Sequence, residues 1–123
     1  MTQEKAIEAA EKKNEATITA PLKLGRTMIT SGIAHTFDTL SLEECSLLHD
    51  FLSDSLSRHT RGDWGDVDHE DWETNDDAYE TGGRILSAYE PSKKYPQLSD
   101  DLKIWIITEW DRSATTILFP SEY

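Results

Sequence analysis

The chain has 123 residues, with 24 acidic against 12 basic side chains and a formal net charge of −12. Its length suits one domain that buries roughly two-thirds of the surface of the unfolded chain. The charge argues against an anionic membrane surface and against direct phosphate-backbone binding, whose affinity comes from Lys and Arg. The single cysteine, Cys45, excludes an internal disulfide. No run approaches the roughly 20 apolar residues of a membrane span, so we expect a soluble, cytoplasmic protein.

The first 16 residues contain good helix formers but almost no apolar face, because Ile7 stands alone among alanines. An isolated helix of this length is marginally stable in water. We therefore expect residues 1–16 to form a flexible or frayed helical tail, and residues 17–123 to form a single domain. Pro21 and Gly25 interrupt the chain where this domain begins.

A short strand is predicted at residues 26–30, followed by a helical stretch around residues 33–37. Ser41 and Glu44 then have the spacing of a capping box, which predicts that a helix begins here. Four apolar residues follow at helical spacing: Leu48, Phe51, Leu52 and Leu56. This helix should extend to about Arg58.

A second main helix is predicted from about Asp68 to Thr81. Gly62 and Gly65 break the chain before it, and the pair Gly82-Gly83 is a natural helix stop.

The last third of the chain has the character of strands, at residues 84–89, 103–108 and 114–119. Residues 103–108 are apolar at both alternating sets of positions, which is typical of a central strand covered on each side. Residues 109–113 are few enough for a tight hairpin. Residues 91–102 contain two prolines and are expected to form a mobile loop that can be shortened with little effect on stability.

These elements predict an α+β fold: a small single domain with two main helices packed on a three- to four-stranded antiparallel sheet.

The most informative segment lies between Asp63 and Glu80, where nine carboxylates fall within eighteen residues that contain no Lys or Arg. Such a density of like charge disfavours a compact fold through self-repulsion. On a helical count, five carboxylates would form one stripe: Asp66, Glu70, Glu73, Asp77 and Glu80. With Asp63, these are the predicted partner-binding residues. Their spacing resembles that of phosphates along a nucleic-acid strand, although an acidic face that only keeps the protein soluble has the same pattern.

The same run also suggests calcium, since Asp66, Asp68, Glu70 and Asp77 occupy positions one, three, five and twelve of a would-be calcium loop. However, Asp71 stands where the tight turn requires Gly, and position twelve lacks the bidentate Glu. The four histidines also lack metal-ligand spacing. We therefore predict neither a metal site nor a cofactor.

Cys45 and His49 stand four residues apart on one helix, a spacing that raises thiol chemistry. Cys45, however, falls on the apolar face of that helix, so a buried structural thiol is the favoured interpretation, and no catalytic residue is predicted.

A polar pocket is the alternative site. It would bring together residues around the second helix and the hairpin turn: Arg58, His59, Asp63, Asn75, Asp111 and Arg112. Their structural interpretation is that the cations cap helix ends and offset nearby carboxylates.

The domain also carries a set of short motifs: Arg58-His59, residues 62–66, Asn75, residues 84–89, residues 105–109, residues 111–113, Thr115-Thr116, Pro120 and Glu122-Tyr123. In combination they resemble a family of small bacterial proteins described as plasmid-related, which occur on plasmids, phages and integrated elements. The resemblance covers about residues 26–123. It departs in a longer loop at residues 91–102, in Trp110 and in the added tail.

The resemblance implies that the protein acts where mobile DNA is exposed to host defence systems. It implies no catalytic residue. In that setting, small acidic proteins commonly act as inhibitors of restriction or CRISPR machinery. We therefore expect a non-enzymatic inhibitor that binds a basic, nucleic-acid-binding protein surface, with nucleic-acid mimicry as one route. It should bind neither nucleic acid nor membrane directly. The alternative is a small enzyme or ligand-binding domain that uses the polar pocket.

Overall fold

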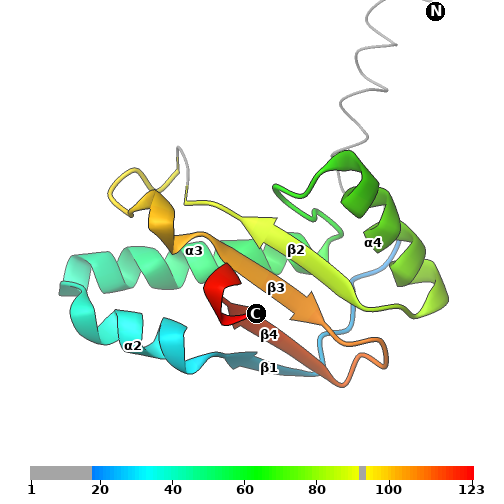
Figure 1. Ribbon diagram of the computed structural model, residues 1–123, viewed down its shortest axis with the longest axis horizontal. Helices are drawn as coiled ribbons and strands as arrows, with labels where there is room; N and C mark the ends of the chain where they lie inside the picture. Colours follow the sequence, from blue (N-terminus) through cyan, green and yellow to red (C-terminus); the bar gives the residue numbers. More distant parts are fainter. Residues whose placement is uncertain (1–17, 92–93) are drawn as a thin grey trace, which may run out of the picture.

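The computed structural model describes residues 18–91 and 94–123, and the predicted tail at residues 1–16 lies outside this part of the chain (Figure 1). The elements are β1 (Arg26–Ile29), α2 (Ser31–Thr39), α3 (Leu42–Thr60), α4 (His69–Thr81), β2 (Ile85–Tyr89), β3 (Ile104–Thr108) and β4 (Ala114–Leu118), with short 3-10 helices η2 (Asp100–Leu102) and η3 (Pro120–Glu122). The α+β class and the small single domain are confirmed. No helix in these two ranges combines the length and the apolar character needed to cross a bilayer.

The four strands form one sheet in the order β1-β4-β3-β2. β3 is antiparallel to both β2 and β4, whereas β1 pairs with β4 in parallel, with Arg26 opposite Ala114 and Ile29 opposite Ile117. The prediction of a purely antiparallel sheet is therefore wrong. The helices and two strands separate β1 from β4 along the chain, so no tight turn fixes their relative direction.

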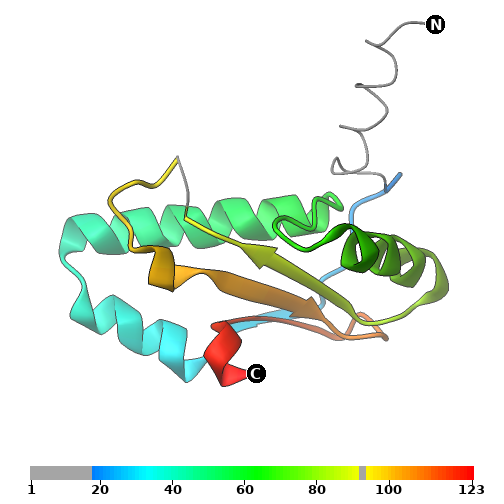
Figure 2. The same ribbon diagram turned by 45° about the horizontal axis from the view of Figure 1, so that its top comes forward.

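The main core lies between the sheet and α3, which crosses one face of the sheet (Figures 1 and 2). Leu48 and Phe51 of α3 pack in the same cluster as Ile104 and Ile106 of β3. The capping box at Ser41 is confirmed, since both of its reciprocal hydrogen bonds are present. α3 ends at Thr60, two residues beyond the predicted end.

The predicted cover on both faces of β3 is confirmed in part. On the face opposite α3, Ile107 is buried, whereas Trp105 is half-buried and meets the ring of Tyr123 edge-on at 5.4 Å. The C-terminal residues therefore cover only part of this face of the sheet.

A second apolar cluster anchors α4 beside β2. Trp72 and Ala78 of α4 pack with Trp64, Leu22 and Ile85, all of them buried. Gly82 ends the helix in the left-handed conformation, as the sequence predicts, with a φ of 86°.

The expectation of a freely mobile connection between residues 91 and 102 is wrong for its described residues. Tyr95 and Leu98 belong to the main core and are 7% and 4% exposed. The Tyr95 ring packs against Phe51, and its hydroxyl donates a hydrogen bond to Asp54 of α3. Two apolar anchors in a polar segment are enough to fix it, so its shortening would remove core side chains.

Candidate functional site

The first part of the acidic run is engaged in structural contacts. The carboxylate of Asp63 pairs with Arg58 at 2.7 Å and accepts the backbone N–H of Gly65 at 3.1 Å. Tyr89 donates its hydroxyl proton to the Asp63 carbonyl at 2.6 Å, and the Arg58 guanidinium lies 4.9 Å from the Tyr89 ring centroid. Asp63 therefore holds the segment before α4 against the sheet.

Asp66 does not lie on the helix, although the predicted stripe includes it. α4 begins at His69, and Asp68 caps it by accepting the N–H of Asp71 at 2.8 Å. Asp66 instead lies alongside β2, where its carboxylate accepts the N–H of Glu90 at 3.0 Å and its own N–H bonds to the Ala88 carbonyl at 2.7 Å. The helical count fails here because Gly65 bridges to β2 and the helix begins only at His69.

The remaining four members of the stripe lie on α4 and are all exposed: Glu70, Glu73, Asp77 and Glu80. Glu73 pairs with His69 on the same helix at 2.9 Å. In the two described ranges, no Lys or Arg forms an ion pair with any of the four. α4 therefore presents a row of carboxylates to solvent, which we call the acidic face.

One further carboxylate of the run, Asp76, has a structural role that the sequence pattern did not reveal. Its carboxylate accepts the indole N–H of the buried Trp64 at 2.9 Å. Asn75, next to it, donates to the carbonyl of Leu86 at 2.8 Å and accepts the N–H of Leu86 at 3.2 Å. The Asn75 amide thus pairs with the outer edge of β2 as a neighbouring strand would, and it fixes α4 in place.

His59 is fully buried at the end of α3, so it is not a pocket residue. Its Nδ1 lies 2.6 Å from the Ser87 hydroxyl, and its Nε2 lies 2.8 Å from the Thr108 hydroxyl. Thr115 donates to the carbonyl of Leu24 at 2.7 Å and lies 2.8 Å from Thr108. Thr108 must therefore donate to Thr115 and accept a proton from Nε2.

This chain of hydroxyls selects the neutral imidazole that carries its proton on Nε2. Burial, with a smaller contribution from Arg112, lowers the pKa of His59 to about 3. The histidine is uncharged at neutral pH. Its hydrogen bonds connect α3 to β2 and β3, and Thr108 extends the chain to Thr115 of β4.

Arg112 and Asp111 serve the hairpin turn and the end of α4. Arg112 donates to the carbonyls of Ala78 and Gly83 at 2.8 and 2.6 Å, so a cation meets the carbonyl end of the helix. Burial lowers the pKa of Arg112. Asp111 accepts both the N–H and the hydroxyl proton of Ser113, and these hydrogen bonds lower its pKa.

The six residues of the predicted polar pocket are therefore not brought together in one cavity. Arg58 pairs with Asp63 beside Tyr89, Asn75 pairs with β2, and Asp111 and Arg112 stabilise the hairpin. Structural hydrogen bonds explain why the sequence contains so many polar residues here. Their spacing in the sequence does not reveal these partners.

Cys45 is likewise structural. Its thiol donates to the carbonyl of Phe37 at 3.0 Å, whereas His49 is exposed and lies beside Asp50. The thiol and the imidazole therefore have separate surroundings, although Cys45 is half-buried and not fully buried as predicted.

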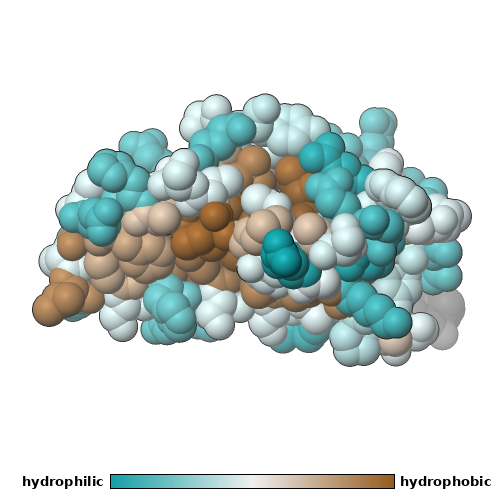
Figure 3. Space-filling view, turned by 90° about the horizontal axis from the view of Figure 1, so that it is seen from below, coloured by the Kyte–Doolittle hydropathy of each residue, from teal (hydrophilic) through white to brown (hydrophobic). Residues whose placement is uncertain are grey.

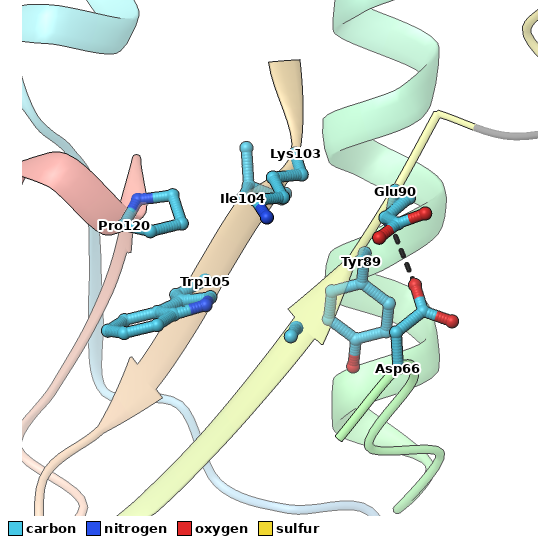
Figure 4. A pocket seen from close by; sticks show the side chains of 8 residues that line it. Asp66, Tyr89, Glu90, Lys103, Ile104, Trp105 and Pro120 are labelled. Carbon is cyan, nitrogen blue, oxygen red and sulfur yellow. Dashed lines mark hydrogen bonds between the residues drawn. The ribbon is translucent and has the colours of Figure 1, made fainter. Parts of the chain in front are cut away.

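A small groove of about 200 Å³ lies on the face of the sheet opposite α3 (Figure 4). It is lined by Asp66, Ala88, Tyr89, Glu90, Lys103, Ile104, Trp105 and Pro120. Sequence reasoning missed this groove, although Trp105 alternates with the core residues Ile104 and Ile106 and so had to face the other side of the sheet.

A different surface lies along β1 and α2, where apolar side chains gather (Figure 3). β1 forms an edge of the sheet, and all four of its residues are exposed, including Met28 and Ile29. Residues 18–37 contain no carboxylate. The acidic and apolar surfaces of the molecule therefore lie on different elements.

No group of three or more His, Cys, Asp or Glu side chains with the arrangement of a metal site occurs within residues 18–91 and 94–123. Comparison of the chain with protein-family models, with characterised proteins and with solved structures gives no match.

Proposed function

We propose that this protein is a non-enzymatic inhibitor that binds a basic, nucleic-acid-binding surface of a host-defence complex. The observation that carries the proposal is the acidic face of α4: four exposed carboxylates on one helix, with no Lys or Arg paired to them in the described part of the chain. The resemblance to plasmid-related proteins supplies the setting.

The acidic face is not required to hold α4 in place. Trp72, Asn75 and Ala78 anchor the opposite side of the helix, and Asp68 and Gly82 cap its ends. In addition, Asp77 and Glu80 lie near the carbonyl end of α4, where negative charge opposes the helix dipole. The last turn contains no basic residue of its own. Arg112 from the hairpin is the cation that meets this end of the helix, and no contact among the described residues that holds α4 in place requires Asp77 or Glu80, which supports a role outside folding.

A basic cleft would attract such a surface over a long range. Electrostatic steering raises the association rate and falls steeply as salt is added. Glu70, Glu73 and Asp77 lie on successive turns, so the Cβ atoms of neighbours are about 5–6 Å apart. This spacing is similar to the separation of phosphates on a nucleic-acid strand. This geometry supports mimicry of a nucleic-acid backbone as the mode of binding.

The test is a pull-down from a host lysate at low and high salt, with bound proteins identified by mass spectrometry. Wild-type protein should capture a nucleic-acid-binding protein at low salt and lose it at high salt. The variant E70K/E73K/D77K should lose the same protein while its circular dichroism spectrum stays unchanged.

The matched control is D38K/E43K/D50K, which makes the same change in net charge on α2 and α3. It should retain most of the binding. If the α4 variant captures the partner as well as wild type does, the acidic face is not the interface.

A further inference from the structure

The register of three neighbouring chain segments creates the groove beside β2. Trp105 of β3 pairs with Ala88 of β2, and Ala88 in turn bridges to Gly65. A Cβ atom at Gly65 would lie 2.0 Å from the Ala88 carbonyl oxygen, so no other residue allows this approach. The floor of the groove therefore carries only a methyl group between Trp105 and the segment of Asp66.

The two walls of the groove differ in chemistry (Figure 4). On one side lie the Trp105 indole and Pro120. The Tyr123 ring contacts the indole edge-to-face, with an interplanar angle of 67°. On the other side stand the carboxylates of Asp66 and Glu90.

The carboxylates of the second wall have unused hydrogen-bonding capacity. One oxygen of Asp66 accepts the Glu90 N–H, and its other oxygen accepts no hydrogen bond from a residue in the described ranges. The Glu90 carboxylate forms no ion pair with those residues. The Trp105 indole and the two carboxylates therefore line opposite sides of the same groove.

We propose that this groove binds an arginine side chain of the basic partner, an inference that rests on the proposed function and locates one anchor of the interface. A guanidinium stacks on an indole face through cation–π attraction and presents parallel N–H donors to a carboxylate. A lysine ammonium lacks the planar fork that uses both walls at once. Buried aromatic and arginine contacts of this kind contribute most of the affinity of many interfaces.

Lys103 distinguishes this cationic ligand from an anionic one. It lines the groove together with Asp66 and Glu90, so these three side chains carry a net charge of −1. Lys103 repels a guanidinium and would attract a carboxylate or phosphate. Removal of its charge by K103Q should therefore tighten arginine binding about twofold, whereas an anionic ligand would bind more weakly.

The experiment uses N-acetyl-arginine methylamide as the probe, titrated into the full-length chain labelled with ¹⁵N. We expect the indole N–H signal of Trp105 and the amide signals of Asp66, Ala88 and Glu90 to shift together with one dissociation constant. The indole signal of Trp110, which is 67% exposed and lies in the hairpin turn, should not move. The lysine and citrulline analogues should bind at least about fivefold more weakly.

Two double variants with equal net charge separate a specific groove from general attraction. D66N/E90Q should weaken arginine binding about tenfold, whereas E70Q/E73Q on α4 should change it less than twofold. The indole signals of the buried Trp64 and Trp72 report that each variant is folded. Three results would overturn the proposal that the groove binds arginine: equal losses of affinity in the two variants, equal affinity for the lysine analogue, or a Trp105 indole signal that does not shift.

These results are independent of the pull-down. If the arginine probe does not bind the groove, the acidic face of α4 remains the proposed interface. If the pull-down with wild-type protein captures no partner but the probe binds, the groove is an arginine site without the proposed partner.

Discussion

The two longest helices of the described residues, α3 and α4, meet the sheet in different ways. α3 buries Leu48, Phe51 and Leu52 in the main core, and its last turn contains the buried His59. α4 is attached by one face only, through Trp72, Asn75 and Ala78, and its other face is a row of carboxylates. The sequence of α3 is therefore explained by folding, whereas only half of α4 is. Charges that folding does not require are the ones to test for binding.

The largest expected effect lies on α3. Phe51→Ala removes a ring that packs against Tyr95 in the main core and should lower the free energy of unfolding by about 3–5 kcal/mol. Glu73→Ala on the acidic face should change it by less than about 0.5 kcal/mol. Urea denaturation measures both values. Similar losses would mean that the outer face of α4 is part of the stabilised structure.

The buried end of α3 should make stability depend on pH. The folded-state pKa of His59, about 3, lies below its ordinary value of 6.5, so the unfolded chain binds the extra proton first. The contribution of His59 is complete above pH 6.5 and is lost as the pH falls towards 3. Each pH unit in this window removes up to about 1.4 kcal/mol.

Imidazole resonances measure this pKa directly. His59 should remain neutral, with its proton on Nε2, at pH values well below its ordinary pKa of 6.5. Titration of His59 near pH 6.5 in the folded protein would contradict its burial and its hydrogen-bond assignment.

The sequence predicted those features of both helices that depend on neighbouring residues. The capping box at Ser41 and Glu44 and the stop at Gly82 are local, because each is built within one helical turn. It did not predict that Asp76 would bind the Trp64 indole, since this contact depends on how α4 docks. The parallel pairing of β1 depends on packing in the same way.

The groove and the pocket illustrate the same limit. The groove requires the register of Trp105, Ala88 and Gly65, which belong to three separate segments. The predicted pocket failed because polar residues close in sequence were already committed to carbonyls and amides elsewhere in the fold, as Asn75 is to Leu86. Spacing shows which groups are available, and the fold decides which of them are already paired.

A smaller effect distinguishes the ends of the two helices. Glu43 lies in the first turn of α3, where negative charge is favourable, whereas Asp77 and Glu80 lie near the opposite end of α4. E43Q should therefore destabilise the protein by a few tenths of a kcal/mol, and D77N/E80Q should stabilise it by up to about 1 kcal/mol. Thermal melts at low and high salt test this, because both differences should shrink as salt is added. A loss of stability in D77N/E80Q would show that these carboxylates support the fold.

The measurement that tests the central claim most directly is the association rate of the captured partner with wild type, E70K/E73K/D77K and D38K/E43K/D50K over a range of salt. We predict that wild type associates fast at low salt and slows steeply as salt rises. The α4 variant should associate slowly at every salt concentration, and the control should keep most of the rate and of its salt dependence. Equal rates for the two variants, or a wild-type rate that does not change with salt, would contradict a binding role for the acidic face of α4.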